Sequence, residues 1–138
     1  MPAARPISVR LQPEVDAPVR NLARRTRRPL GRVINELLDH ALRMQRFPGI
    51  VFANGPAGPR ARLVGTGLDV WELVSLVRAY DSTDALLKAF PALAQSHIDT
   101  ALAYTAAYPE EIEGAIAENE RPMEEVMRES PLIKKFVV

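Results

Sequence analysis

Few residues in this chain have the types and the spacing that catalysis requires. His40 and His97 are the only histidines, and neither has a Cys or a second His nearby. Glu110, Glu111 and Glu113 follow a proline, in what we expect to be the first turn of a helix, where the helix dipole stabilises negative charge. The glycines match no phosphate-binding loop. We therefore predict that the chain is not an enzyme and that it uses no metal or cofactor.

The net charge is divided unevenly between two parts of the chain. The full chain carries +1. Residues 1–46 contain ten Lys and Arg against four Asp and Glu, which gives +6, whereas residues 47–138 contain eight against thirteen, which gives −5. An asymmetry of this kind indicates that only the basic part meets a polyanion such as nucleic acid.

Composition also predicts the compartment. The chain has no cysteine, which excludes disulfides and thiolate metal sites and is typical of a reducing cytoplasm. No apolar run approaches the roughly 18 residues that a membrane span needs, and residues 1–6 are too short and too polar for a signal peptide. We expect a cytoplasmic protein without a membrane partner.

The basic part begins with a strand pattern that has no partner in its vicinity. Residues 7–11 alternate apolar and polar side chains, and Pro13 ends the pattern. Two helical patterns follow, with apolar stripes within residues 15–23 and 33–42. Because a lone strand leaves its backbone groups unpaired, we predict that it pairs antiparallel with the same strand of a second copy. The chain would then be a homodimer.

A strand and two helices that need a second copy resemble the ribbon-helix-helix family of bacterial DNA-binding proteins. The residues that carry the resemblance are Val9-Arg10-Leu11, then Leu22-Ala23-Arg24-Arg25-Thr26, then Val33-Ile34. In that family the paired strands lie in the major groove. The resemblance implies that the outward-facing Ser8 and Arg10 contact operator DNA, with the Arg10 guanidinium bonding a guanine.

The start of the second helix is the other DNA contact that the resemblance implies. Family members usually have a Ser or Thr cap there, and its hydroxyl and the backbone amides hold a phosphate. This chain has Pro29, Leu30 and Gly31 in its place, so the hydroxyl is missing. The amides near Gly31 can still face a phosphate within a basic surrounding. The implied phosphate contacts are Arg27, Arg28, Gly31 and Arg32.

The second part of the chain has the pattern of a small hairpin followed by helices. Residues 50–53 and 61–64 have strand character and flank a loop rich in Gly and Pro. Capping patterns and prolines then predict about four helices. These are expected to start near Asp69, near Asp81 or Ser82, near Gln95 and near Pro109.

Three motifs in this part resemble a small helical domain of VapB-type antitoxins. They are Val64-Gly65-Thr66-Gly67-Leu68-Asp69-Val70, then Phe90-Pro91-Ala92-Leu93, then Ile98-Asp99-Thr100-Ala101-Leu102-Ala103-Tyr104. Gly67 and Ala94 stand where that family usually has Arg and Thr, so no role of those two side chains carries over.

The family's domain is similar to a helix-turn-helix unit, which raises the question of DNA binding. This chain has no Lys or Arg between Lys88 and Arg121, and a phosphate-lined groove repels such a surface. We therefore interpret the unit as a protein-contact module, with purely structural support as the alternative.

The end of the chain is where we place the contact with a partner. Residues 131–138 include five large apolar side chains, and an apolar, β-prone end of this kind needs a cover. The cover is either the chain's own dimer or a toxin, for which the resemblance implies a PIN-domain ribonuclease that holds Mg²⁺. The predicted toxin-binding residues are Arg121, Met123, Arg128, Leu132, Ile133, Lys134, Lys135 and Phe136.

Together these inferences predict a mainly α protein with three segments. Residues 1–46 form a ribbon-helix-helix-like arm for dimerisation and DNA binding, residues 47–119 form a small helix-turn-helix-like domain with one short β-hairpin, and residues 120–138 form a partner-binding tail. The predicted function is that of a type II antitoxin that neutralises a PIN-domain toxin and represses its own operon, with no small-molecule substrate. Two alternatives stay open, namely a stand-alone dimeric transcriptional regulator and a dimeric interaction scaffold without DNA binding.

Overall fold

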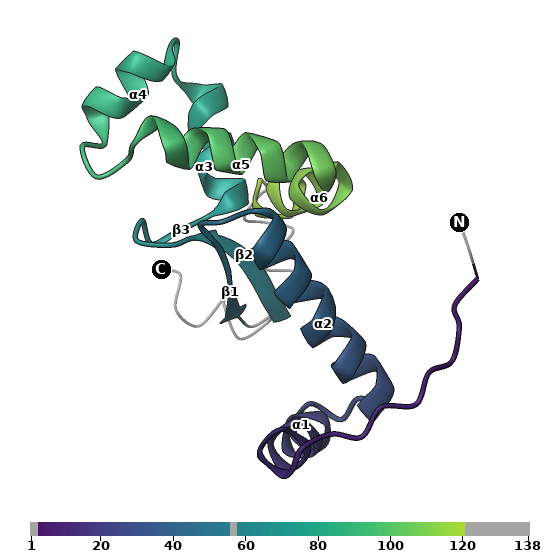
Figure 1. The fold of residues 1–138 in the computed structure, drawn as a ribbon. Helices are drawn as coiled ribbons and strands as arrows, with labels where there is room; N and C mark the ends of the chain where they lie inside the picture. The colour runs from purple at the N-terminus through teal and green to yellow at the C-terminus, as the bar shows by residue number, and fades with distance from the viewer. Residues whose placement is uncertain (1–2, 56–57, 121–138) are drawn as a thin grey trace, which may run out of the picture. The chain divides into compact units, whose positions relative to one another are not determined.

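The computed structural model describes residues 3–55 and 58–120. In this part of the chain there are six helices and one three-stranded antiparallel sheet (Figure 1), which confirms the mainly helical fold class. The chain divides into two compact units, residues 1–43 and residues 44–138, which we call the first and the second unit.

One helix and all but the last three residues of a second make up the regular structure of the first unit. Helix α1 spans Pro13–Thr26, and helix α2 spans Leu30–Arg46. Proline at the first position of α1 is favourable, because the amide hydrogen that it lacks would have no partner inside the helix. Both helices were predicted from the apolar stripes, and both are confirmed.

The first unit has a small core and a large exposed apolar face. Its buried residues are Val19, Ala23 and Val33. Further along α2 the apolar stripe has no cover, and Leu38 and Leu42 are 58% and 64% exposed. One copy of the first unit therefore leaves most of the α2 stripe in water.

The strand predicted for residues 7–11 is not formed in the single chain. Residues 3–12 belong to no helix or strand, and Ile7 and Val9 are exposed. A strand needs a hydrogen-bonded neighbour, and in the described part of the chain every strand belongs to the second unit. The ribbon thus stays a prediction about the dimer.

A three-stranded sheet opens the second unit. Strand β1 spans Ile50–Gly55 and pairs antiparallel with β2, which spans Gly58–Leu63. This confirms the predicted hairpin. A third strand that the sequence did not predict, β3 at Leu68–Asp69, pairs with the other edge of β2. Gly65 and Gly67 have positive φ angles of 80° and 72° in the turn between β2 and β3, a conformation that glycine adopts without steric cost.

Four helices complete the second unit, as predicted, and each starts at a local signal. They are α3 at Val70–Ala79, α4 at Thr83–Ala89, α5 at Gln95–Ala107 and α6 at Pro109–Asn119. The Ser82 hydroxyl accepts a hydrogen bond from the amide of Ala85 at 3.1 Å and caps α4. At the start of α5, Nδ1 of His97 accepts one from the amide of Ala94 at 3.0 Å. His97 is therefore a helix-boundary residue.

The second unit has one contiguous core. Helix α3 packs against α5 and α6, and the sheet lies at the start of α3 (Figure 1). The Tyr104 ring is fully buried and meets Phe47 edge to face at 5.5 Å between ring centroids. The buried residues of this core are Phe47, Ile50, Ala61, Leu63, Val70, Leu73, Val74, Leu86, Leu93, Ile98, Ala101, Tyr104, Ile112 and Ile116.

No helix among the described residues is both long enough and apolar enough to cross a membrane. The tail residues predicted to bind a toxin, from Arg121 to Phe136, lie outside the described residues.

Candidate functional site

The turn between α1 and α2 brings the basic residues of the first unit together. Arg27 ends α1 in the left-handed conformation, with φ 52° and ψ 45°. Its amide donates to Arg24 O at 3.2 Å, and the amide of Arg28 donates to Ala23 O at 3.1 Å. These bonds satisfy carbonyls at the end of α1, a role that usually falls to glycine at this position. The turn therefore has a defined geometry although it contains no glycine before Pro29.

Arg28 is held by contacts on both sides of this turn. Its guanidinium makes a two-point contact with the Glu36 carboxylate, through Nη1 to Oε2 and through Nη2 to Oε1 at 3.4 Å. Its Nε also donates to Thr26 Oγ1 at 3.3 Å. Because the fork of Arg28 is already occupied by a carboxylate, Arg28 is placed to fix the turn between the helices.

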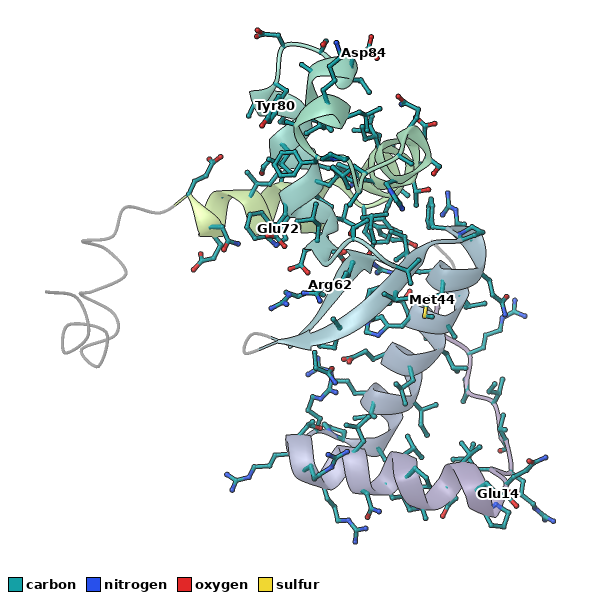
Figure 2. All side chains as sticks on the ribbon, turned by 90° about the vertical axis from the view of Figure 1, so that its left-hand side faces the viewer. Glu14, Met44, Arg62, Glu72, Tyr80 and Asp84 are labelled. Carbon is teal, nitrogen blue, oxygen red and sulfur yellow. The ribbon has the colours of Figure 1, made fainter. Side chains whose placement is uncertain are left out.

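A shallow hollow lies beside this turn, and we call it the arginine hollow. It is lined by Arg20, Ala23, Arg24, Arg27, Arg28 and Leu30. Figure 2 shows nitrogen-tipped side chains projecting outward from α1. Of the predicted DNA contacts, the structure brings only Arg27 and Arg28 into this hollow.

The other predicted DNA contacts of the first unit lie on separate segments. Ser8 and Arg10 are exposed in the stretch that precedes α1. Gly31 and Arg32 are exposed in the first turn of α2, which contains no acidic residue. A Cβ at Gly31 would meet no atom within 4 Å. The start of α2 is thus open to a ligand from this side.

Sequence reasoning did not identify Arg20 and Arg24 as part of this surface. They are four residues apart on α1, which places them on one side of a helix, and Arg27 follows three residues later. That spacing was the available signal. It pointed to a row of guanidinium groups that continues from α1 into the turn.

The second unit contains a different charged centre around Asp69, the one buried polar or charged residue in the described part of the chain. Its side chain is 5% exposed. Arg60 Nε lies 2.8 Å from Oδ2, Arg62 Nε donates to Oδ1 at 3.2 Å, and Trp71 Nε1 donates to Oδ2 at 3.2 Å. The Asp69 amide donates to Glu72 Oε1 at 2.9 Å. We call these residues the Asp69 cluster, and Figure 2 labels Arg62 and Glu72 within it.

The Asp69 cluster ties the sheet to α3. Arg62 lies directly opposite Asp69 in the pairing of β2 with β3, and Asp69 precedes the first residue of α3. The guanidinium of Arg60 crosses Gly55 so closely that a Cβ at Gly55 would overlap Nη1. The sequence predicted Asp69 as a helix cap, and the Glu72 bond agrees, but the two arginines on its carboxylate were not foreseen. The cluster therefore joins β2 and β3 to the start of α3.

Helices α5 and α6 contain no Lys or Arg, and α6 carries most of their acidic residues. Gln95 Nε2 donates to Asp99 Oδ1 at 2.9 Å on the outer side of α5, and Leu102 on that helix is 44% exposed. Tyr104, although its ring is buried, donates its hydroxyl to Glu111 Oε2 at 2.6 Å. No group of three or more His, Cys, Asp or Glu in the described part of the chain is arranged to hold a metal ion.

The comparison with protein families bears on the second unit alone. Residues 50–105 match the family described as a protein of unknown function, DUF433. The matched segment runs from the first residue of β1 through most of α5 and includes the whole Asp69 cluster. No curated protein and no solved structure matches the chain.

Proposed function

We propose that this chain is the antitoxin of a type II toxin-antitoxin system. It acts as a cytoplasmic homodimer that binds operator DNA through its first unit and neutralises a PIN-domain ribonuclease through the residues after α6. The observation that carries the proposal is the first unit itself, which combines an uncovered apolar face with a cluster of arginines. No catalytic role is assigned to any residue.

The uncovered face of the first unit supports the homodimer. Ile7, Val9, Leu37, Leu38 and Leu42 are all exposed in the single chain. Fully burying a side chain of this size contributes roughly 1.5–3 kcal/mol. If a dimer covers half of the surface of these five side chains in each copy, the burial contributes on the order of 10 kcal/mol. This is comparable with the roughly 4–15 kcal/mol that association costs. A second copy also supplies the neighbour that residues 7–11 need to form a strand.

The charge of the first unit supports DNA as its ligand. Residues 1–46, which comprise the first unit and the last three residues of α2, carry +6, so a dimer presents about twice that charge to a polyanion. Arg10 on the predicted ribbon is suited to base contact, because a guanidinium bonds guanine at two points. The residues around the turn are suited to backbone phosphates, which position the protein without selecting a sequence.

The second unit supports a role in protein contact. Its helices α5 and α6 contain no Lys or Arg, so a nucleic-acid groove would repel them. The family that matches residues 50–105 is often linked to antitoxin-like proteins. Both observations favour the antitoxin over the stand-alone transcriptional regulator, which needs only the first unit.

Co-expression with the protein encoded next to it tests the proposal. The full chain is expected to form a stable complex in which ribonuclease activity is suppressed and which retards a fragment of its own promoter. A chain that ends at Asn119 is expected to bind the promoter equally well but to release the ribonuclease activity. Inhibition by the shortened chain would place the contact at or before Asn119, and a complex without any ribonuclease component would favour the regulator.

A further inference from the structure

The arginine hollow is lined by four arginines that do not belong to the predicted ribbon. We infer that the hollow holds a phosphate group of the DNA backbone and that Arg20, Arg24 and Arg27 bind it. The inference rests on the proposed function, because it takes DNA as the ligand, and it adds the outer side of α1 to the surface that DNA meets.

The three arginines of the proposed site lie close together. Arg20, Arg24 and Arg27 follow one another at intervals of four and three residues, so they lie on one side of α1 and its end. All three line the same hollow. A guanidinium presents its N–H groups in a planar fork that matches the oxygens of a phosphate. Arg20 contacts Asp16 through Nε and Arg24 contacts Asn21 through Nη2, so each of the three guanidinium groups keeps N–H groups that can bind a phosphate.

The hollow contains more positive than negative charge. Two of its four arginines have a carboxylate partner, since Arg20 Nε lies 3.0 Å from Asp16 Oδ1 and Arg28 contacts Glu36. Arg24 donates to the neutral side chain of Asn21. Neither Arg24 nor Arg27 has an ion pair within the described residues. The hollow therefore keeps an excess of positive charge that an anion can neutralise.

Apolar residues lie next to the arginines in the hollow. The hollow is also lined by Ala23, which is 7% exposed, and by Leu30. An apolar floor lowers the local dielectric, which strengthens the attraction between a guanidinium and a phosphate. The contact between Arg28 and Glu36 then fixes the turn that carries Arg27. Arg28 is a positioning residue for this site.

Arg24 and Arg25 provide a matched pair of variants for the test. They are neighbours in the last turn of α1, where both favour the helix dipole, and both are exposed. Arg25 does not line the arginine hollow. Arg24→Ala and Arg25→Ala therefore remove the same charge from the same turn, and only the first removes a fork from the hollow.

The experiment measures the affinity of the full chain for its promoter duplex and for a random duplex by fluorescence anisotropy, between 50 and 200 mM salt. Arg24→Ala is expected to weaken both about tenfold or more, since a hydrogen bond to a charged group is lost. Arg25→Ala is expected to change them by about twofold or less, because it only lowers the long-range field. The double variant Arg20→Ala/Arg24→Ala should make the negative slope of log K against log salt shallower by about 0.9 per subunit.

Circular dichroism of each variant checks that α1 stays folded, and Arg24→Gln replaces Arg24→Ala if it does not. Equal losses for Arg24→Ala and Arg25→Ala would overturn the hollow as a phosphate site while leaving the proposed DNA binding intact. Failure of the unaltered chain to bind either duplex would overturn the DNA-binding part of the proposed function, and the hollow with it.

Discussion

The two units of this chain differ in how completely they bury their apolar side chains. Among the residues that the structure describes, nine large side chains are under 2% exposed, and all but Val33 belong to the second unit. In contrast, six of the ten large hydrophobic residues that are exposed in this part of the chain lie in residues 1–43. The second unit closes its core within one chain, whereas the first unit has an apolar face that one chain cannot cover.

The units also differ in how they treat charge. In the second unit the buried Asp69 carboxylate has two arginines and a tryptophan N–H around it. In the first unit the arginines that line one hollow outnumber their carboxylate partners. The apolar side chains and the charges of the second unit are therefore satisfied within one chain, and we propose that a second copy and a polyanion satisfy those of the first unit.

The largest expected effect comes from placing charge on the uncovered face of α2. Leu38→Asp/Leu42→Asp should convert the dimer to a monomer and abolish DNA binding, because burying an unpaired carboxylate costs several kcal/mol. Sedimentation equilibrium of the full chain measures this. Leu102→Asp on α5, where the leucine is 44% exposed, is the control and should leave the dimer unchanged. If only the control variant lost the dimer, the interface would lie in the second unit.

The next effect tests the closed core of the second unit. Leu73 on α3 is 0% exposed, and Leu73→Ala should lower the free energy of unfolding by about 2–5 kcal/mol because it leaves a cavity. Leu102→Ala should cost only about 0.5 kcal/mol. Urea unfolding, monitored by circular dichroism, measures the loss in each variant. Similar losses for both variants would show that this core is not closed as described.

A smaller effect is expected from the Asp69 cluster. Asp69→Ala removes the common partner of Arg60, Arg62 and Trp71 and should cost about 1–3 kcal/mol. The loss stays moderate because both guanidiniums, about a third exposed, can turn to water. The thermal midpoint of the second unit measures this loss of stability. A variant as stable as the parent would mean that the cluster does not join the sheet to α3.

The smallest effect is expected from the exposed ion pair between α3 and α6. Arg78 Nη1 donates to Glu113 Oε2 at 3.2 Å, and this hydrogen bonding lowers the pKa of Glu113 below its ordinary value of 4.5. Since the folded pKa is depressed, the stabilisation is complete above pH 4.5 and is lost as pH falls through the folded value.

Arg78→Gln should therefore lower the thermal midpoint slightly at neutral pH, and the difference from the parent should shrink below pH 4.5 and vanish once the pH lies below the folded pKa of Glu113. A difference that persists at acid pH would show that Arg78 acts through packing.

The sequence predicted those features that depend on neighbouring residues. Ser82 and Pro109 marked helix starts, and the strand patterns around the Gly- and Pro-rich loop marked the hairpin. Strand β3 was missed because it has two residues, too few for a pattern. The pairing of Arg62 with Asp69 depends on strand register, which the sequence does not encode locally.

The arginine hollow shows the same limit within the first unit. Its shape depends on Arg27 in a left-handed conformation, which sequence patterns associate with glycine. The contact from Arg28 to Glu36 joins residues of two helices. Only the spacing from Arg20 to Arg24 could be read without the fold, and it is common on solvent-exposed helices.

Amide hydrogen exchange of residues 7–11 tests most directly the claim that a second copy completes the first unit. These residues have no strand partner within the described chain, so their amides should exchange rapidly in a monomer. We expect slow exchange in the full chain at concentrations where it is dimeric, and rapid exchange in Leu38→Asp/Leu42→Asp. Rapid exchange at all concentrations in the unaltered chain, with the second unit protected, would contradict the paired ribbon.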